Sequence, residues 1–173
     1  MNDLSAKILA MSEASTLEIF STMANLQGTV VSRSVEIADV PVEGVGGCVS
    51  FAGSLSGIVY VLMPETLAAR VTCAMLGCDK AEASEIKDVV GELTNMVAGG
   101  LKNQLAKEGF ESCLTIPTFI RGTGSKINVR NLTLAATNMI RFPGGEELVD
   151  VRIFARKMSP ASSSSSHFDL RGS

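Results

Sequence analysis

The sequence predicts an α+β fold: an antiparallel sheet of about six strands, with two long helices and one short helix packed on one face. Three observations support this prediction. The hydrophobic patterns follow the order helix, three strands, two helices, then three or four strands. Short turns join the strands, which favours antiparallel pairing. The 173 residues are 46% hydrophobic and 19% charged, as expected of a globular domain that buries its own core.

The first part of the chain is predicted to form a long helix and three strands. Apolar residues recur at helical spacing over residues 4–26, and Gly28 is the expected stop. The third strand is apolar throughout, which indicates burial on both faces. The strands are expected at residues 29–37, 49–55 and 58–63, with a glycine-rich turn at residues 44–47.

Two helices are predicted next. Pro64 suits the first turn of a short helix, which Gly77 ends. A longer helix is expected over residues 82–108, with Ser84 as the candidate N-cap and Gly109 as the stop. Acidic residues near its start and lysines near its end fit the helix dipole.

Strand patterns return after the long helix. Residues 114–120 resemble a strand in which Pro117 indicates an edge or a bulge. Residues 122–126 lack the spacing of a phosphate loop and are predicted to be a turn. Alternation over residues 127–140 changes phase near Asn131, as in one bent strand or two short ones. A turn at 142–145 precedes a last strand near 149–153.

The domain boundary is expected near the C-terminus. Residues 1–158 form the predicted domain. Residues 159–173 include five consecutive serines and are predicted to be a disordered tail, native or partly added for expression. The single histidine, His167, falls in that tail, so the domain lacks the commonest general base.

Composition excludes several classes of function. The net charge is -3 and there is no tryptophan, which argues against a broad nucleic-acid surface. The cysteines form no Cys-x-x-Cys pair, which argues against a zinc site. No signal peptide and no run of about 18 apolar residues is evident, so we expect a cytoplasmic protein with reduced thiols and no membrane insertion. The cysteines are Cys48, Cys73, Cys78 and Cys113.

The predicted long helix has two distinct faces. Its apolar stripe contains Ile86, Val89, Val90, Leu93, Val97, Leu101 and Leu105. The opposite face contains Asp88, Glu92, Asn95, Gly99 and Lys102. Glu92 and Asn95 are three residues apart and are therefore neighbours on the helix surface. On spacing alone, this face is either simply solvated or a docking surface.

Three glycines inside this helix require an explanation, because each costs up to about 1 kcal/mol against alanine. Gly100 leans toward the apolar stripe, where close packing against the sheet explains it. Gly91 and Gly99 lie on or beside the polar face. Small residues there leave room for another molecule to approach Glu92 and Asn95.

At this helix the sequence resembles a known family. The segment VGELTNMVAGGL, residues 90–101, is similar to the signature helix of the CheC/CheX/FliY chemotaxis phosphatases, with its Glu-x-x-Asn core. Residues 53–60, 64–68 and 74–77 resemble the preceding strand and helix. The first helix has Glu18-Ile-Phe-Ser21, which lacks the asparagine. A single motif on the second long helix resembles CheX more than CheC, and the match spans roughly residues 4–156.

The resemblance implies a CheC-like fold and a chemistry that needs no histidine. The family removes phosphate from the phospho-aspartate of a CheY-type response regulator. Asn95 would orient the attacking water and Glu92 would pair with the regulator's active-site lysine, these two being the expected catalytic residues. Asp88, Gly91, Gly99 and Lys102 are the expected partner-binding residues. No cofactor of its own is expected, because Mg²⁺ would belong to the receiver domain. A homodimer is also implied.

A second hypothesis stays open at this point. The chain could be a non-catalytic module that binds a receiver or belongs to a flagellar switch assembly. Flagellar switch proteins share the fold class but lack the motif, so the intact Glu92 and Asn95 pair favours the phosphatase. Small-molecule or nucleotide binding has no support beyond glycine-rich turns.

Overall fold

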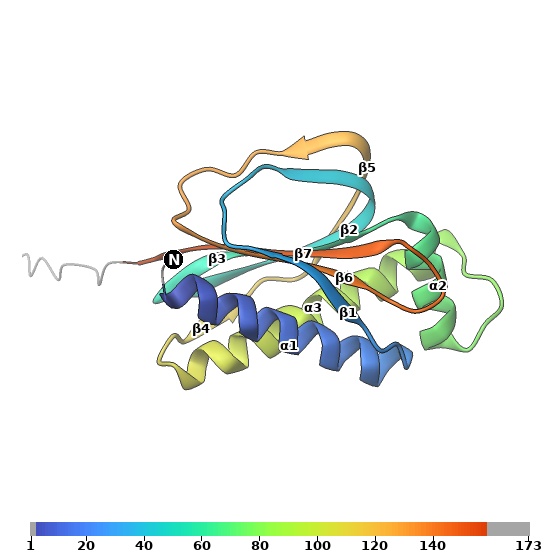
Figure 1. Cartoon of the computed structure of the whole chain (residues 1–173), viewed down its shortest axis with the longest axis horizontal. Helices are drawn as coiled ribbons and strands as arrows, with labels where there is room; N and C mark the ends of the chain where they lie inside the picture. Colours follow the sequence, from blue (N-terminus) through green and yellow to red (C-terminus); the bar gives the residue numbers. More distant parts are fainter. Residues whose placement is uncertain (1–2, 159–173) are drawn as a thin grey trace, which may run out of the picture.

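The computed structural model describes residues 3–158, which form three helices and a seven-stranded sheet (Figure 1). The helices are α1 (Asp3–Ala24), α2 (Glu65–Leu76) and α3 (Ala83–Lys107). The strands are β1 (Thr29–Ser34), β2 (Val40–Gly53), β3 (Leu55–Met63), β4 (Ser112–Leu114), β5 (Thr118–Ile127), β6 (Leu134–Arg141) and β7 (Leu148–Lys157). The predicted tail, residues 159–173, lies outside the described residues.

The sheet is antiparallel throughout, in the order β1-β6-β7-β3-β2-β4. The seventh strand, β5, also pairs with β2, so β2 has both β4 and β5 as partners on that edge. Figure 1 shows all three helices on one side of this sheet, with α1 and α3 side by side. The predicted α+β fold is therefore confirmed, with seven strands in place of about six. Within residues 3–158, no helix is both long enough and apolar enough to span a membrane.

Two apolar clusters cover the two faces of the sheet. The larger one packs the helices against the sheet. The smaller one lies on the other face, where β5 and the start of β2 fold back over it (Figure 1). Tyr60 and Leu62 of β3 point into the smaller cluster, while Val59 and Val61 point into the larger one. This double burial confirms the prediction made from the continuous apolar run.

The glycine-rich segment at residues 44–47 is part of β2, and the turn predicted there is wrong. These glycines serve close approaches between elements. A side chain at Gly47 would overlap with the Thr94 hydroxyl on α3, and one at Gly46 would overlap with the Val61 carbonyl on β3. The turn predicted at residues 122–126 is likewise inside β5, where Gly124 has a positive φ of 64° and its N–H donates to Glu43.

Three further expectations need correction. Helix α1 ends at Ala24 because Asn25 adopts the left-handed conformation (φ 53°). Gly28 was predicted to end the helix. It lies instead beyond the helix end, at a position where a side chain would overlap with the Phe142 ring. Helix α3 is capped by Glu82, which forms a reciprocal capping box with Glu85, so Ser84 is not the N-cap.

Strand β1 also differs from its predicted pattern. The alternation of residues 29–37 places Val31 and Ile37 on one face of the predicted strand, yet they are 42% and 47% exposed. A register shift between Val30 and Ser32 interrupts the alternation, and Val30 packs against the core in their place. The end of the predicted strand, beyond Ser34, is a connection to β2.

Candidate functional site

The exposed face of α3 is the candidate site. The packing of the opposite, buried face determines which side chains of α3 point outward. The predicted apolar stripe is buried along its length, apart from the half-buried Ile86. Thr94 and Ala98 are buried as well and widen the stripe. With one side of α3 held against the sheet and α1, the opposite side faces outward.

The structure places all six predicted site residues on this outward side of α3. Asp88 and Glu92 are exposed, and Asn95 and Lys102 are half-buried. Within the described chain, none of these four side chains makes a hydrogen bond or an ion pair. Glu92 and Asn95 are separated by about 4.5 Å along the helix axis. Their polar groups are therefore available to another molecule at the same time.

The three helix glycines divide into two kinds. A methyl group at Gly99 would meet nothing within 4 Å, and one at Gly91 would meet only Pro117, at 3.9 Å. One at Gly100 would lie 2.8 Å from the Ser15 hydroxyl of α1. Gly100 therefore permits close packing between the two helices, and the expected contact with the sheet is wrong. Gly91 and Gly99 leave the polar face clear.

Helix α3 is held firmly beneath this face. The Thr94 hydroxyl donates to the Val90 carbonyl at 2.7 Å and fills the space left by Gly47 on β2. Gln104 donates to the Ser15 hydroxyl at 2.8 Å and to the Met11 carbonyl at 3.1 Å, which ties α3 to α1. Sequence patterns did not predict the contact with Gly47, although a glycine inside a strand often marks a close backbone approach.

A groove between α1 and α3 borders the site. Its α1 side includes Ser15, Glu18 and Ile19, and its α3 side includes Met96 and Gly99. The carboxylate of Glu18 is exposed, so α1 also presents an acid. Ser21, which stands where an asparagine would complete a second motif, accepts a hydrogen bond from Gln27 at 2.7 Å. The pair of a carboxylate and an amide is thus found on α3 and not on α1.

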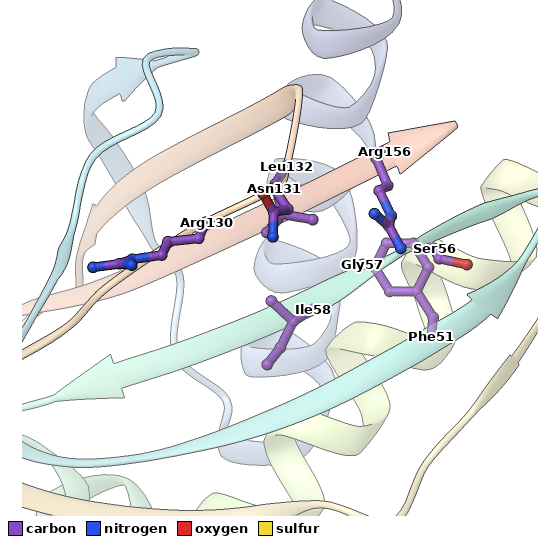
Figure 2. Close-up of a pocket in the computed structure, with 8 residues that line it drawn as sticks. All are labelled: Phe51, Ser56, Gly57, Ile58, Arg130, Asn131, Leu132 and Arg156. Atoms are coloured by element: carbon purple, nitrogen blue, oxygen red, sulfur yellow. The ribbon is translucent and has the colours of Figure 1, made fainter. Parts of the chain in front are cut away.

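A hollow near the start of β3 and the end of β7 is a second candidate (Figure 2). Figure 2 shows the Arg130 side chain extending away from the others. The hydroxyl of Ser56 accepts a hydrogen bond from the Gly53 N–H at 3.3 Å. No carboxylate, thiol or imidazole lines this hollow, so its lining supports catalysis less well than α3 does. The residues that line the hollow are Phe51, Ser56, Gly57, Ile58, Arg130, Asn131, Leu132 and Arg156.

The cysteines do not form an activated site. Burial raises the pKa of the Cys48 thiol. Two causes raise the pKa of the Cys73 thiol: burial, which is the larger, and a hydrogen bond with Cys78. A raised pKa disfavours the nucleophilic thiolate. Over residues 3–158, no three His, Cys, Asp or Glu side chains gather in a way that could hold a metal ion.

The fold is an antiparallel sheet with three helices on one side, and α3 presents a polar face outward. The model of the chemotaxis phosphatase CheX matches residues 45–140, and the chain belongs to this family. That range includes all of α3 and the six site residues. No curated protein sequence matches the chain significantly.

Solved structures agree with this assignment. A putative chemotaxis protein from Desulfovibrio vulgaris Hildenborough is 25% identical, with a TM-score of 0.79 over 87% of this chain and 97% of that one. A chemotaxis protein CheX from Desulfovibrio desulfuricans is also 25% identical, with a TM-score of 0.75 over 88% and 99%. CheX in the CheX-CheY-BeF3-Mg complex from Borrelia burgdorferi is 22% identical and shares the fold, with a TM-score of 0.71 over 86% and 97%.

Proposed function

We propose that this chain removes the phosphate from the phospho-aspartate of a CheY-type receiver domain. The observation that carries the proposal is the Glu92 and Asn95 pair, which has no partner in the described structure and lies on a rigid helix with open space at Gly99. Membership of the CheX family supports it. So does the Borrelia complex, in which a protein of this fold is bound to CheY.

Asn95 is the proposed catalytic residue. Its amide can donate and accept hydrogen bonds at once, and it orients a water molecule in line with the bond to phosphorus. An amide is too weak a base to remove a proton from water. Asn95 would therefore contribute to catalysis by positioning the water molecule. Holding a nucleophile in attack geometry lowers the barrier by avoiding the entropy cost of a bimolecular encounter. A glutamine orients the attacking water in GTP hydrolysis in the same way.

Glu92 determines how the partner docks. Its carboxylate is exposed on the same face as Asn95, and we assign it to the active-site lysine of the receiver. Asp88 and Lys102 extend the charged surface, and Gly91 and Gly99 allow the receiver to approach the helix. The receiver supplies the acyl phosphate and Mg²⁺, the ion recorded in the Borrelia complex. Such receivers act in the cytoplasm, which is where we place this chain.

The direct test measures phosphate loss from a purified receiver. A CheY-type receiver is phosphorylated with acetyl phosphate, freed of the donor, and followed with and without this protein. We expect the phosphoryl group to be lost faster when the protein is present at substoichiometric amounts, because a catalyst turns over. Assays against each receiver of the same genome would identify the substrate. Binding of the phosphorylated receiver without any change in its lifetime would instead favour the alternative, a non-catalytic module of the flagellar-switch type.

Replacing Glu92 should mainly affect docking. We expect Glu92→Ala to raise KM about tenfold, the order of loss when one partner of an interfacial ion pair is removed. The value of kcat at saturating receiver should change much less. Glu36→Ala, at an exposed carboxylate between β1 and β2, is the matched control and should behave as wild type. Equal KM values for wild type and Glu92→Ala would contradict this role.

We also propose that the chain forms a homodimer, as the family resemblance implies. The sheet has edge strands, β1 among them, and unpaired strand edges favour association. Light scattering of the purified protein gives the mass directly. A monomer at all concentrations tested would contradict this proposal without affecting the assignment of Asn95.

A further inference from the structure

The connection between β4 and β5 carries an apolar side chain that the core does not use. Ile116 is 86% exposed, and each other exposed large apolar residue among 3–158 is at most 52% exposed. A single exposed apolar residue needs no special explanation by itself. Two features give this one significance: its backbone setting, and the position of the adjacent Pro117 next to α3.

The backbone at Ile116 belongs to the connection between β4 and β5, which contacts β2 on both sides of Ile116. Before it, the Thr115 N–H donates to the Ser50 carbonyl at 2.9 Å, and the Thr115 hydroxyl accepts from the Ser50 N–H at 3.0 Å. After it, Thr118 pairs with Cys48. Two residues, Ile116 and Pro117, therefore lie opposite the single residue Val49. The edge predicted from Pro117 is confirmed, because the strands on either side of it, β4 and β5, pair only with β2 in the described sheet.

The connection between β4 and β5 lies directly against the candidate site. A methyl group added to Gly91 would be 3.9 Å from the Pro117 ring. Gly91 is one helical turn before Asn95 and on the same side of α3. Ile116 therefore projects from a rigid two-residue segment that borders α3 on the side of Asn95.

The same geometry argues against a partner that adds a further strand to the sheet at the β4–β5 edge. Proline has no N–H to donate, so Pro117 blocks continuous hydrogen bonding to a further strand. A partner that engages Ile116 would do so through side chains. The surface it would cover continues onto the Glu92 and Asn95 face, where the described side chains leave space open at Gly99.

We infer that Ile116 is a docking residue for the phosphorylated receiver domain, which packs an apolar patch against it while Asn95 enters the receiver's active site. This inference rests on the proposed function. Ile116 then contributes binding energy on the Asn95 side of α3, and Glu92 contributes ionic pairing toward the α1 side. The receiver is thereby held from two directions around the catalytic amide.

The test compares Ile116→Ser with Ile37→Ser in the phospho-receiver assay. Ile37 is 47% exposed and adjoins β1, at the opposite edge of the sheet from β4, which makes it a matched control. We expect Ile116→Ser to raise KM about tenfold, as for loss of one buried aliphatic contact, with kcat unchanged. Ile116→Leu should restore most of the affinity, and Ile37→Ser should equal wild type.

The outcomes separate the two proposals. An active wild type whose KM is unchanged by Ile116→Ser overturns the docking role alone. A wild type that does not accelerate dephosphorylation overturns the proposed function and, with it, this inference. A fall in oligomer mass for Ile116→Ser, measured by light scattering, assigns Ile116 to a contact between copies of this chain and also overturns the inference.

Discussion

Asn95→Ala is expected to reduce the accelerated dephosphorylation about 100-fold or more, leaving little beyond the receiver's own rate of phosphate loss. The magnitude is the order of loss seen when one positioned side-chain hydrogen-bond donor is removed from a hydrolase active site, about 100-fold to 1,000-fold. Alanine has a higher helix propensity than asparagine, and the Asn95 side chain has no hydrogen bond within the described structure. The variant should therefore fold at least as stably as wild type.

The matched control for this prediction is Asn103→Ala. Asn103 is exposed on the same helix, eight residues or about 12 Å further along the axis. We expect this variant to keep wild-type kcat. Binding of the receiver should survive in Asn95→Ala, because Glu92 is intact. Full kcat in Asn95→Ala would contradict the assignment of Asn95 as the residue that orients water.

Gly47→Ala is expected to have the largest effect on stability. The added methyl carbon would lie 2.8 Å from the Thr94 Cβ and would overlap with the Thr94 hydroxyl. Strand β2 and helix α3 must then separate, or Thr94 must leave its rotamer. Overpacking of this kind costs about 1–3 kcal/mol in free energy of unfolding. In a domain of this size, each kcal/mol lowers the melting temperature by about 2–4 °C.

Thermal unfolding of the double variant tests the cause. Thr94→Ala removes the overlapping hydroxyl, so Gly47→Ala combined with Thr94→Ala should lose less stability than the two single losses added together. Gly99→Ala is the opposite control, since its methyl group meets nothing within 4 Å. It should stabilise α3 by about 0.5–1 kcal/mol. Additive losses in the double variant would show that the contact is not the source of the effect.

The same displacement should reduce activity. Thr94 immediately precedes Asn95, so a shift of α3 away from β2 would move the amide that we propose as catalytic relative to the docked receiver. Misplacement by about 1 Å can cost about 100-fold in rate. Gly47 is therefore a positioning residue: kcat should fall in Gly47→Ala even at temperatures where the variant remains folded.

Local periodicity was sufficient to predict α3 and the direction of its two faces. The apolar stripe from Val89 to Leu105 follows from apolar residues that recur three and four positions apart, and this spacing is visible in the sequence itself. The end of α2 at Gly77 and the edge position of Pro117 were also predicted from single residues, because glycine tolerates a left-handed backbone and proline lacks an N–H. The sequence alone therefore determined which side chains share the exposed face.

The tertiary structure decided what surrounds that face. The glycines at residues 44–47 looked like a turn, yet they line β2 because α3 and β3 approach it closely, and no local pattern distinguishes the two uses. Gly100 meets Ser15 of α1, and Pro117 meets Gly91, across 85 and 26 positions of sequence. Such contacts depend on which elements pack together. The proposed catalytic pair, Glu92 and Asn95, is thus a property of one helix. The packing of that helix, the open space beside the pair and the position of Ile116 come from long-range contacts.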